Sequence, residues 1–393
     1  MKPYTFRITE SQLAPLLDHL FPGDNDEHGA VIAAGVSRTE RGVQLLARDV
    51  FLARDGIDYV PGRHGYRALT ADFVARCSNH CAREKLAYFA VHCHGGHDSV
   101  AFSNTDLESH RRGYPALLDI VDPGPAGALV FARNAVAGEV WTRDGVHELS
   151  SMTVVGPTHR RMYPSPSASP LVDPTYQRQS MLFGPAGQAI LSAAKVGIIG
   201  LGGAGSLINE SMAHLGVGEI VAVDFDKLSP TNRPRVVGSR PWDVFPWMLK
   251  SDYAWLRALG ERLARYKVRI AERVARNANP AIRYTPIIGD ITDAETARAL
   301  RDCDYLFLCA DTAQSRLVFN ALVHQYLIPG VQVVREGLGR RRHGTSDGRL
   351  RCRTPRRSAR QRRLPEVQWA HFGGPTAARG SFRGRAATPS LRR

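Results

Sequence analysis

The sequence of 393 residues lacks the features that would place it in a membrane or in a disulfide-bonded class. No apolar run approaches the ~18 residues that a membrane-spanning helix needs, and the N-terminus lacks a signal-peptide pattern. The 6 cysteines stand at irregular spacing, which excludes a disulfide framework of the small secreted type. These absences predict a cytoplasmic protein with no membrane partner, long enough for roughly two to three domains.

Lysine is scarce, with 6 lysines against 46 arginines, a ratio typical of GC-rich coding bias. The net charge is +15, but residues 336–393 account for +13 of it, with 16 arginines, no lysine and three acids. The first 335 residues therefore carry only +2. Because the basic excess is confined to one segment, nucleic-acid binding by the whole chain is excluded, and nucleic acid would be contacted only through this tail.

Three changes in sequence pattern divide the chain. Residues 1–150 alternate short apolar runs with helix-like stretches, a mixed α/β pattern. Residues 151–175 include Pro-Ser-Pro-Ser-Ala-Ser-Pro, which cannot form a helix and predicts a linker. In residues 176–335, apolar strands alternate with helical segments, as in βαβ units. The sequence thus predicts an α/β fold: a mixed α/β domain, a linker, a doubly wound Rossmann-like domain and an irregular Arg-rich tail.

Two histidines and an aspartate in the first domain have the spacing of metal ligands. A buried strand runs into His92 and His94, and residues i and i+2 of a strand point to the same face. Ser103 and Asp106 fit the N-cap and the third position of a helix. Two imidazoles and one carboxylate form a zinc set that leaves a fourth position for water. Glu27 is a candidate base for that water, and Ser103 a candidate donor to an oxyanion.

The plain alternative is a pair of strand histidines beside a capped helix. A glutamate, then His-x-His, then Ser-x-x-Asp in this order resembles the motif of the JAMM (MPN+, JAB) metalloproteases, over about the first 150 residues. The resemblance implies Zn2+ bound by His92, His94 and Asp106, Glu27 as acid and base, and Ser103 stabilising the tetrahedral intermediate. Members of that family remove ubiquitin or ubiquitin-like proteins from conjugates or precursors.

Four glycines follow the first strand of the second domain and precede a helical pattern. Gly200, Gly202, Gly203 and Gly205 would let the backbone turn tightly and approach phosphates, and the helix N-terminus would supply amide donors for anions. The next strand ends in Asp224, a position suited to ribose hydroxyls. Taken alone, this pattern fits an NAD-dependent oxidoreductase as well as an ATP-binding domain.

Cations and a further carboxylate separate these two interpretations. Arg235 and Lys267 follow the glycine-rich strand unit, and Asp311, Arg316 and Asn320 follow a later apolar strand. Cleavage of ATP between its α- and β-phosphates develops charge on the departing pyrophosphate, and Mg2+ requires a protein carboxylate. Hydride transfer needs no such group of cations, so the oxidoreductase interpretation is disfavoured.

Together these residues resemble the ThiF/E1-like adenylyltransferase superfamily over roughly residues 176–335. In that superfamily a protein's C-terminal glycine carboxylate is adenylated, and an arginine of the entry segment, here Arg178, reaches ATP from the partner subunit of a homodimer. The resemblance implies these contacts to ATP and Mg2+: the four glycines and Asn232, Arg235 and Lys267 at the phosphates, Asp224 or Asp226 at the ribose, and Asp311 at Mg2+.

Two segments depart from that superfamily. The 31 residues between Arg235 and Lys267 are more than compact members of the superfamily have, and they are expected to form an inserted, partly helical excursion. Its aromatic residues, expected to pack in a small core, are Trp242, Phe245, Trp247, Tyr253 and Trp255. In the tail of residues 336–393, Cys352 is the only cysteine, so no thioester transfer is predicted. This tail is expected to be a disordered polycation or a shifted reading frame, and its lack of lysine and of patterning favours the latter.

The two motif sets predict a fused processing and activating enzyme for a bacterial-type ubiquitin-like modifier, using ATP, Mg2+ and Zn2+. The first domain would trim the modifier or release it from targets, and the second would adenylate the exposed C-terminus before an E2-like partner acts. One alternative is activation of a sulfur-carrier protein of the thiamine or molybdopterin type. Another is a non-catalytic scaffold with a nucleotide-binding domain. The identity of the modifier is not predicted.

Overall fold

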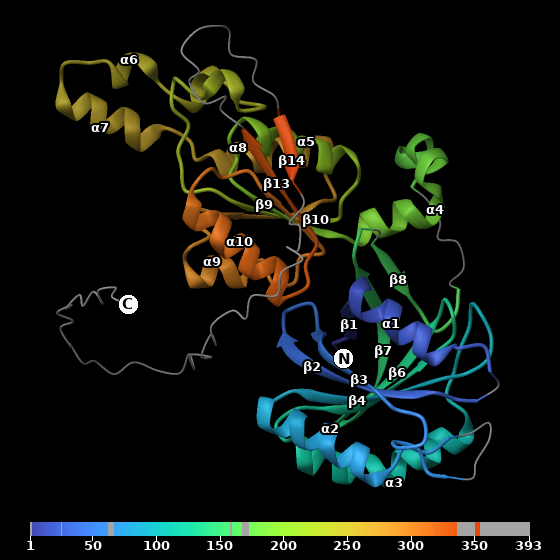
Figure 1. The fold of residues 1–393 in the computed structure, drawn as a ribbon. Coiled ribbons are helices and arrows are strands. Elements are labelled where there is room, and N and C mark those ends of the chain that lie inside the picture. The colour runs from blue at the N-terminus through green and yellow to red at the C-terminus, as the bar shows by residue number, and fades with distance from the viewer. Residues whose placement is uncertain are drawn as a thin grey trace, which may run out of the picture. The chain divides into compact units, whose positions relative to one another are not determined.

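The computed structural model describes residues 2–24, 26–61, 67–157, 159–166, 173–335 and 350–353. These residues form two β-sheets, each accompanied by helices (Figure 1). Within these ranges no helix combines the length and the apolar character needed to cross a bilayer. The mixed α/β class predicted from the sequence is confirmed.

The first sheet has eight strands in the order β1-β3-β2-β4-β5-β6-β7-β8. Strand β1 pairs in parallel with both β3 and β7, so the sheet closes on itself. The bounds of its strands are β1 (Tyr4–Thr9), β2 (Gly29–Arg38), β3 (Val43–Leu52), β4 (Ala87–Cys93), β5 (Ala126–Phe131), β6 (Val136–Thr142), β7 (Gly145–Val155) and β8 (Arg160–Met162).

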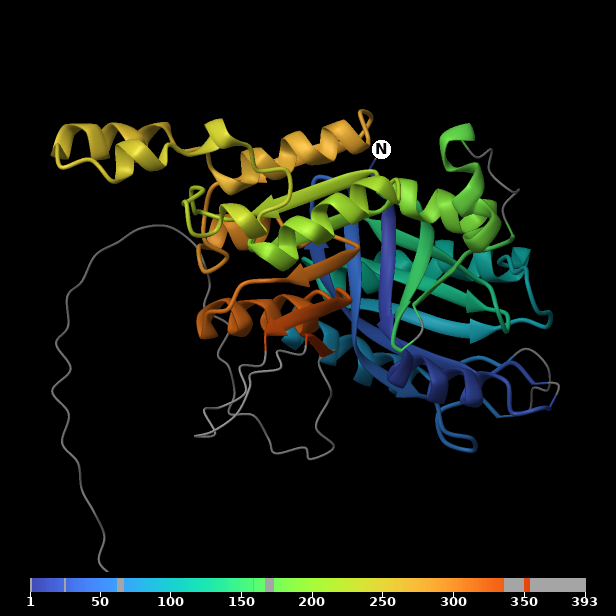
Figure 2. The same cartoon turned by 90° about the horizontal axis from the view of Figure 1, so that it is seen from above.

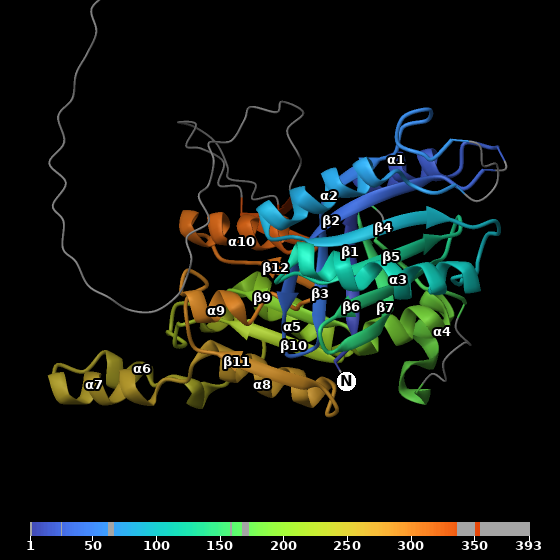
Figure 3. The same cartoon turned by 90° about the horizontal axis from the view of Figure 1, so that it is seen from below.

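Helices cover both faces of this sheet (Figures 1 and 3). On one face, the first helix buries Leu13, Leu16 and Leu20, whose helical spacing gives one apolar stripe. On the other face, Phe73 and Tyr114 of the next two helices pack in a second cluster. Strands that contribute to both clusters, such as β4 with Phe89 and Tyr88, are therefore held between two apolar layers. These helices are α1 (Glu10–Leu20), α2 (Ala71–Glu84) and α3 (Asn104–Val121).

The second sheet has the order β11-β10-β9-β12-β13-β14, and all pairs are parallel except β13–β14. Its strands are β9 (Lys195–Ile199), β10 (Glu219–Val223), β11 (Arg283–Ile287), β12 (Tyr305–Leu308), β13 (Gly330–Arg335) and β14 (Leu350–Arg353). The helices that accompany it are η1 (Pro174–Tyr176), α4 (Gln177–Ala193), α5 (Gly203–His214), α8 (Lys267–Ala278), α9 (Ala294–Arg298) and α10 (Ala313–Gln325).

Helices cover both faces of the second sheet as well. Ala213 of α5 and Val268 of α8 pack in one apolar cluster, whereas Phe319 and Leu322 of α10 pack in another. This is the doubly wound arrangement predicted from the alternation of strands and helices. The chain runs outward in one direction from β9 to β11 and in the other from β12 to β13. The point of reversal lies between β9 and β12, where such sheets bind ligands.

Three strands fall across the segments expected to be irregular. Strand β7 continues to Val155, and β8 lies within residues 151–175, so part of the expected linker belongs to the first sheet. Strand β14 lies within residues 336–393 and pairs with β13. Residues 167–170 of the Pro/Ser run at 164–170 and the rest of the tail lie outside the described residues.

The insertion between Arg235 and Lys267 extends away from its sheet (Figures 1 and 2). It follows η2 (Arg233–Arg235) and comprises η3 (Pro241–Asp243), α6 (Pro246–Leu249) and α7 (Ala254–Leu263). The expectation that its aromatic residues pack in a small core is wrong for the four that are 60–67% exposed, namely Trp242, Trp247, Tyr253 and Trp255. A two-helix hairpin has too few residues to enclose them.

Candidate metal centre and nucleotide pocket

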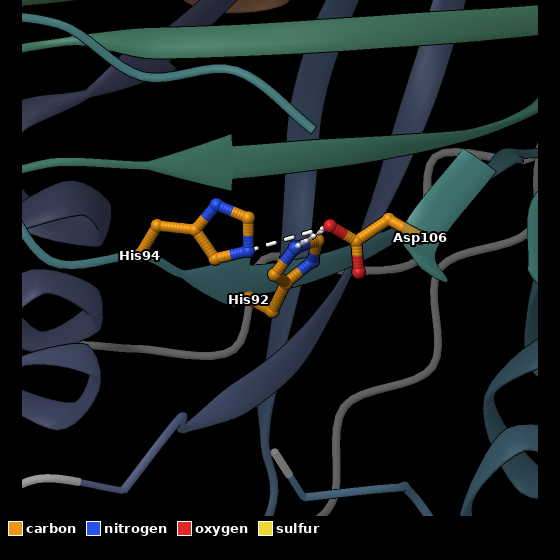
Figure 4. Close-up of side chains that lie close together, drawn as sticks. All are labelled: His92, His94 and Asp106. Atoms are coloured by element: carbon orange, nitrogen blue, oxygen red, sulfur yellow. Dashed lines mark ion pairs between the residues drawn. The ribbon is translucent and has the colours of Figure 1, made fainter. Parts of the chain in front are cut away.

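Two histidines at the end of β4 and an aspartate on α3 meet in the first domain. His92 Nε2 lies 3.5 Å and His94 Nε2 3.3 Å from Asp106 Oδ2. One donor atom from each of the three lies within 4.8 Å of the others. Figure 4 shows the three side chains pointing toward one another. The strand parity and helix start inferred from the sequence therefore bring the predicted ligands together.

Local hydrogen bonds fix the orientation of two of these side chains. The backbone N–H and the hydroxyl of Ser103 donate to Asp106 Oδ2 at 2.8 and 2.7 Å, which forms the N-terminal capping box of α3. His94 Nδ1 lies 3.0 Å from the carbonyl of Ala101. Because a carbonyl only accepts, Nδ1 carries the proton and Nε2 keeps a free lone pair for a metal.

The chemistry of this cluster fits a divalent metal. Asp106 is 5% exposed, and His92 Nε2 is buried without a hydrogen-bond partner. Burial alone would raise the pKa of Asp106, but its close contacts with the two imidazoles hold the pKa far below its usual value. The adjacent Asp106 carboxylate in turn raises the pKa of His94. Two imidazoles and an ionised carboxylate are the protein ligands of catalytic zinc sites.

Glu27 lies beside this cluster, as the sequence predicted. Its Oε1 is 3.8 Å from His94 Nε2, and its partial burial raises the pKa of its carboxyl group. The neighbouring His28 N–H donates to Cys93 Sγ at 3.4 Å, and Cys93 Sγ donates to the Leu20 carbonyl at 3.0 Å. The loop that carries Glu27 is thus attached to the strand that carries the histidines.

The Ser103 hydroxyl is hydrogen-bonded to Asp106, whereas an oxyanion donor would point toward the substrate. This hydroxyl donates to Asp106 and accepts from the Asp106 N–H at 3.2 Å. In this arrangement the hydroxyl proton is donated to Asp106 within the N-terminal cap of α3. Its role toward a tetrahedral intermediate stays a prediction.

A cavity of about 760 Å³ lies at the carboxyl ends of the parallel strands in the second sheet. Its volume falls in the range of small-molecule sites. The predicted residues that line it are Gly200, Gly202, Gly203, Asp224, Asp226, Arg235, Lys267 and Asp311. Phe225, Thr312, Ser315 and Arg316 line it as well. From the sequence, Arg316 is one of the cations that favour ATP, whereas the other three have no predicted role, although Phe225 lies between two predicted residues.

The glycine-rich turn after β9 closes tightly on itself. Gly200 has a φ of +87°, a conformation that a side chain would strain. A Cβ at Gly205 would overlap the carbonyl of Gly200, so glycine is required for the close approach of α5 to this turn. Gly205 therefore supports the pocket by packing and is not among the residues that line it.

Two aspartates after β10 have separate partners. Asp224 Oδ2 accepts from the Leu201 N–H at 2.6 Å, and its Oδ1 accepts from the Asp226 N–H at 2.8 Å. Burial raises the pKa of Asp224. Lys267 Nζ donates to Asp226 Oδ2 at 2.5 Å and lies 3.8 Å from Asp224 Oδ1. Asp224 thus holds the glycine-rich turn, which leaves the half-exposed Asp226 as the better acceptor for a ligand.

The remaining predicted residues differ in position. Within the described part of the chain, the Arg235 and Asp311 side chains have no hydrogen-bond or ion-pair partner, and both line the cavity. Asn232 accepts from the Ser229 N–H at 2.8 Å in a local turn and is absent from the lining. Arg178 lies exposed on α4 and is also absent from it. The roles of Asn232 and Arg178 at ATP stay predictions.

Comparison with known proteins places this pocket in a family. The ThiF family matches residues 176–376, just over half of the chain, and the chain belongs to that family. The match includes β14 and begins after the metal cluster. It extends beyond residue 335, where we expected the resemblance to end.

Individual relatives share the same part of the chain. The molybdopterin-synthase adenylyltransferase of Escherichia coli K12 is 31% identical over 148 residues, which are 37% of this chain and 52% of that protein. The sulfur carrier protein ThiS adenylyltransferase of Bacillus subtilis is 28% identical over 147 residues, 37% and 39% of the two chains. The chain spans about half or less of these relatives. The structure of E. coli tRNA N6-threonylcarbamoyladenosine dehydratase matches with 21% identity and a TM-score of 0.33, over 40% of this chain and 59% of that one.

Proposed function

We propose that the second domain adenylates the C-terminal carboxylate of a small carrier protein at the expense of ATP. The observation that carries this proposal is the cavity in which Lys267, Arg235 and Asp311 converge. Two relatives are named as adenylyltransferases of molybdopterin synthase and of the sulfur carrier protein ThiS. These names favour a sulfur-carrier protein as the substrate over a ubiquitin-like modifier. Both kinds of substrate present the same chemistry, a flexible carboxylate at the end of a small protein.

Each cavity residue has a role that follows from its charge and partners. The amides of the glycine-rich turn would bind phosphate oxygens, and Asp226 would accept from the ribose hydroxyls. Arg235 and Lys267 would neutralise the charge that develops on pyrophosphate as it leaves. Asp311 would hold Mg2+, which would supply positive charge for the phosphate groups of ATP. No protein nucleophile is required, because the substrate carboxylate itself attacks the α-phosphorus.

We further propose that the protein acts as a homodimer through the α4 region. Met181 and Leu182 are 86% and 79% exposed, and Phe183 next to them is also exposed. Exposed apolar residues in one segment are typical of an interaction surface. Arg178 lies on the same helix and would enter the pocket of the partner subunit. An E2-like protein remains a proposed later partner.

Exchange of radiolabelled pyrophosphate into ATP tests the adenylation. The B. subtilis sulfur carrier ThiS serves as one probe, and a ubiquitin-like protein with a C-terminal glycine as another. We expect exchange with at least one probe, reduced by about 100-fold or more in Asp311→Asn because charge stabilisation of the leaving group is lost. Asp252→Asn, an exposed residue of the insertion, is the matched control. Exchange that is equal in both variants would contradict the role of Asp311.

A second function is favoured by the metal cluster of the first domain. We propose a zinc-dependent peptidase or isopeptidase in which His92, His94 and Asp106 hold Zn2+. When bound, this ion would lower the pKa of a water molecule to about 7. Glu27 would accept the proton from that water and deliver it to the leaving amine. One chain would then expose a carrier's C-terminus and activate it.

Metal content and cleavage test the second function together. The purified chain should bind about one zinc, and it should cleave a reporter fused to the C-terminal glycine of a ubiquitin-like protein. Glu27→Gln should keep the zinc and lose cleavage, whereas Glu108→Gln, an exposed residue of α3, should keep both. Absence of zinc would favour the alternative in which the first domain is a scaffold without activity.

A further inference from the structure

Arg316 is a cation of the nucleotide cavity that has no partner within the described part of the chain. Its Nε is fully shielded from solvent and makes no hydrogen bond. Other shielded guanidinium groups are paired, as Arg273 is with both carboxylate oxygens of Asp243. A buried donor without an acceptor is costly, so its presence in a cavity points to a ligand that supplies the acceptor.

The backbone of Arg316 is held firmly by the start of α10. Thr312 is the N-cap, and its side chain accepts from the Ser315 N–H at 3.1 Å. The hydroxyl groups of Thr312 and Ser315 lie 2.6 Å apart. These contacts fix the first turn of the helix, directly before Arg316. The guanidinium group is therefore presented from a rigid element and not from a loop.

Arg316 enters the cavity from the β12 side, as Asp311 does, whereas the other charged residues assigned to ATP lie on the β10 side. Asp226 follows β10 and Lys267 begins α8, whereas Arg316 follows β12. In the sheet, β10 and β12 flank β9, so their ends lie about 10 Å apart. Lys267 and Arg235 already supply the cations for phosphates. We therefore expect Arg316, the further cation beyond the glycine-rich turn, to bind a second anionic group.

We propose that Arg316 binds the carboxylate of the second substrate, the C-terminus of the carrier protein. This inference rests on the proposed adenylation. One carboxylate oxygen forms a bond to the α-phosphorus, the bond from that phosphorus to the bridging oxygen of pyrophosphate breaks, and pyrophosphate leaves with the electron pair. The other carboxylate oxygen stays hydrogen-bonded to Arg316 and becomes the carbonyl oxygen of the acyl adenylate. A guanidinium group suits this role because it is always charged and its N–H groups make strong hydrogen bonds to carboxylate oxygens.

A pair of ligands separates the carboxylate site from the nucleotide site. Calorimetry on the full chain compares AMP with adenosine 5′-sulfamate acylated by glycylglycine, in which an acylated sulfamate replaces the phosphate and adds the acyl carbonyl. We expect the acylated analogue to bind the unmodified chain at least about 10-fold more tightly than AMP, the effect of one hydrogen bond to a charged donor. In Arg316→Ala this advantage should disappear, while the affinity for AMP stays within about 2-fold.

Arg298→Ala, an exposed arginine of α9, is the matched control and should behave like the unmodified chain. Arg316→Gln, which keeps much of the side-chain volume, should give the same result as Arg316→Ala and guards against a packing defect. Equal weakening of AMP and the analogue would assign Arg316 to the nucleotide phosphate and overturn the inference. An unchanged advantage of the analogue would overturn it as well. If the unmodified chain binds neither ligand, the proposed adenylation itself fails.

Discussion

The substitution Asp106→Asn separates metal binding from helix capping. Asp106 Oδ2 accepts from the N–H and the hydroxyl of Ser103, and the amide oxygen of asparagine can accept the same two hydrogen bonds. The substitution removes the negative charge that a divalent metal requires. We therefore expect a small change in stability without metal and a large loss of stabilisation by zinc.

The magnitude follows from ligand linkage. Zinc that binds only the folded chain stabilises it by about 2.7 kcal/mol when its free concentration is 100 times Kd. For a unit of about 150–250 residues, this corresponds to a rise of about 5–10 °C in the unfolding midpoint. If loss of the carboxylate weakens binding by about 100-fold, the stabilisation at the same zinc concentration falls to about 0.4 kcal/mol, or roughly 1 °C.

Differential scanning calorimetry with buffered free zinc measures these shifts. Asp98→Asn is the matched control, because Asp98 is an exposed neighbour whose carboxylate accepts only from Asn134 among the described residues, at 2.9 Å. It should show the full zinc shift. An equal zinc shift in Asp106→Asn would place the metal elsewhere, and no shift in the unmodified chain would refute the three-ligand site.

Three further predictions concern stability and reactivity. Asp243 is buried and paired with Arg273 at 2.6 and 3.0 Å, so Asp243→Ala should lower the free energy of unfolding in urea by about 3–5 kcal/mol, and a loss below about 1 kcal/mol would contradict this pairing. Gly205→Ala should lower the free energy of unfolding by about 1–3 kcal/mol because the new Cβ meets the Gly200 carbonyl. Gly202→Ala places its Cβ in open space and should change that free energy by no more than about 0.5 kcal/mol, and similar values for both variants would be inconsistent with the close turn. Burial raises the pKa of Cys77 to about 11 and that of Cys81 to about 12, so both thiols are protonated at pH 8 and should resist iodoacetamide in the folded chain. Rapid modification of either thiol, detected by mass spectrometry, would argue against their burial.

The convergence of the three candidate metal ligands could be predicted from the sequence because their geometry is local. The parity of a strand places His92 and His94 on one face, and a capping box fixes Asp106 against Ser103 three residues away. Glu27 was a weaker prediction because its position depends on tertiary pairing. Strand β2 pairs with β4 so that Gly29 lies opposite His92, and no local pattern specifies that register.

In the second domain, the pattern predicted the cavity but not the partners of each residue. Asp224 and Asp226 look equivalent in the sequence, yet Asp224 is taken up by two backbone N–H groups and Asp226 by Lys267. Asn232 is used within its own turn. Such assignments depend on how α8 packs beside β10, which is set by tertiary packing and not by spacing along the chain.

The exposed aromatic residues of the insertion were predicted incorrectly for a related reason. Composition indicates that Trp247 and Trp255 are apolar enough to be buried, but burial requires a neighbouring element to cover them. Helices α6 and α7 pack on each other and extend away from the sheet, so most of each ring stays exposed. The apolar residues can be identified from the sequence, whereas the elements that cover them depend on the tertiary fold.

Direct titration with nucleotides tests the central claim that the cavity after β9 and β12 is an ATP site. Isothermal titration of the full chain with Mg2+-ATP, and separately with NAD+, distinguishes an adenylating pocket from a dinucleotide-binding one. The account predicts saturable binding of Mg2+-ATP that Lys267→Ala weakens by about 10-fold or more, because a buried cation that faces the phosphates is lost. Tight binding of NAD+ without binding of Mg2+-ATP would contradict it.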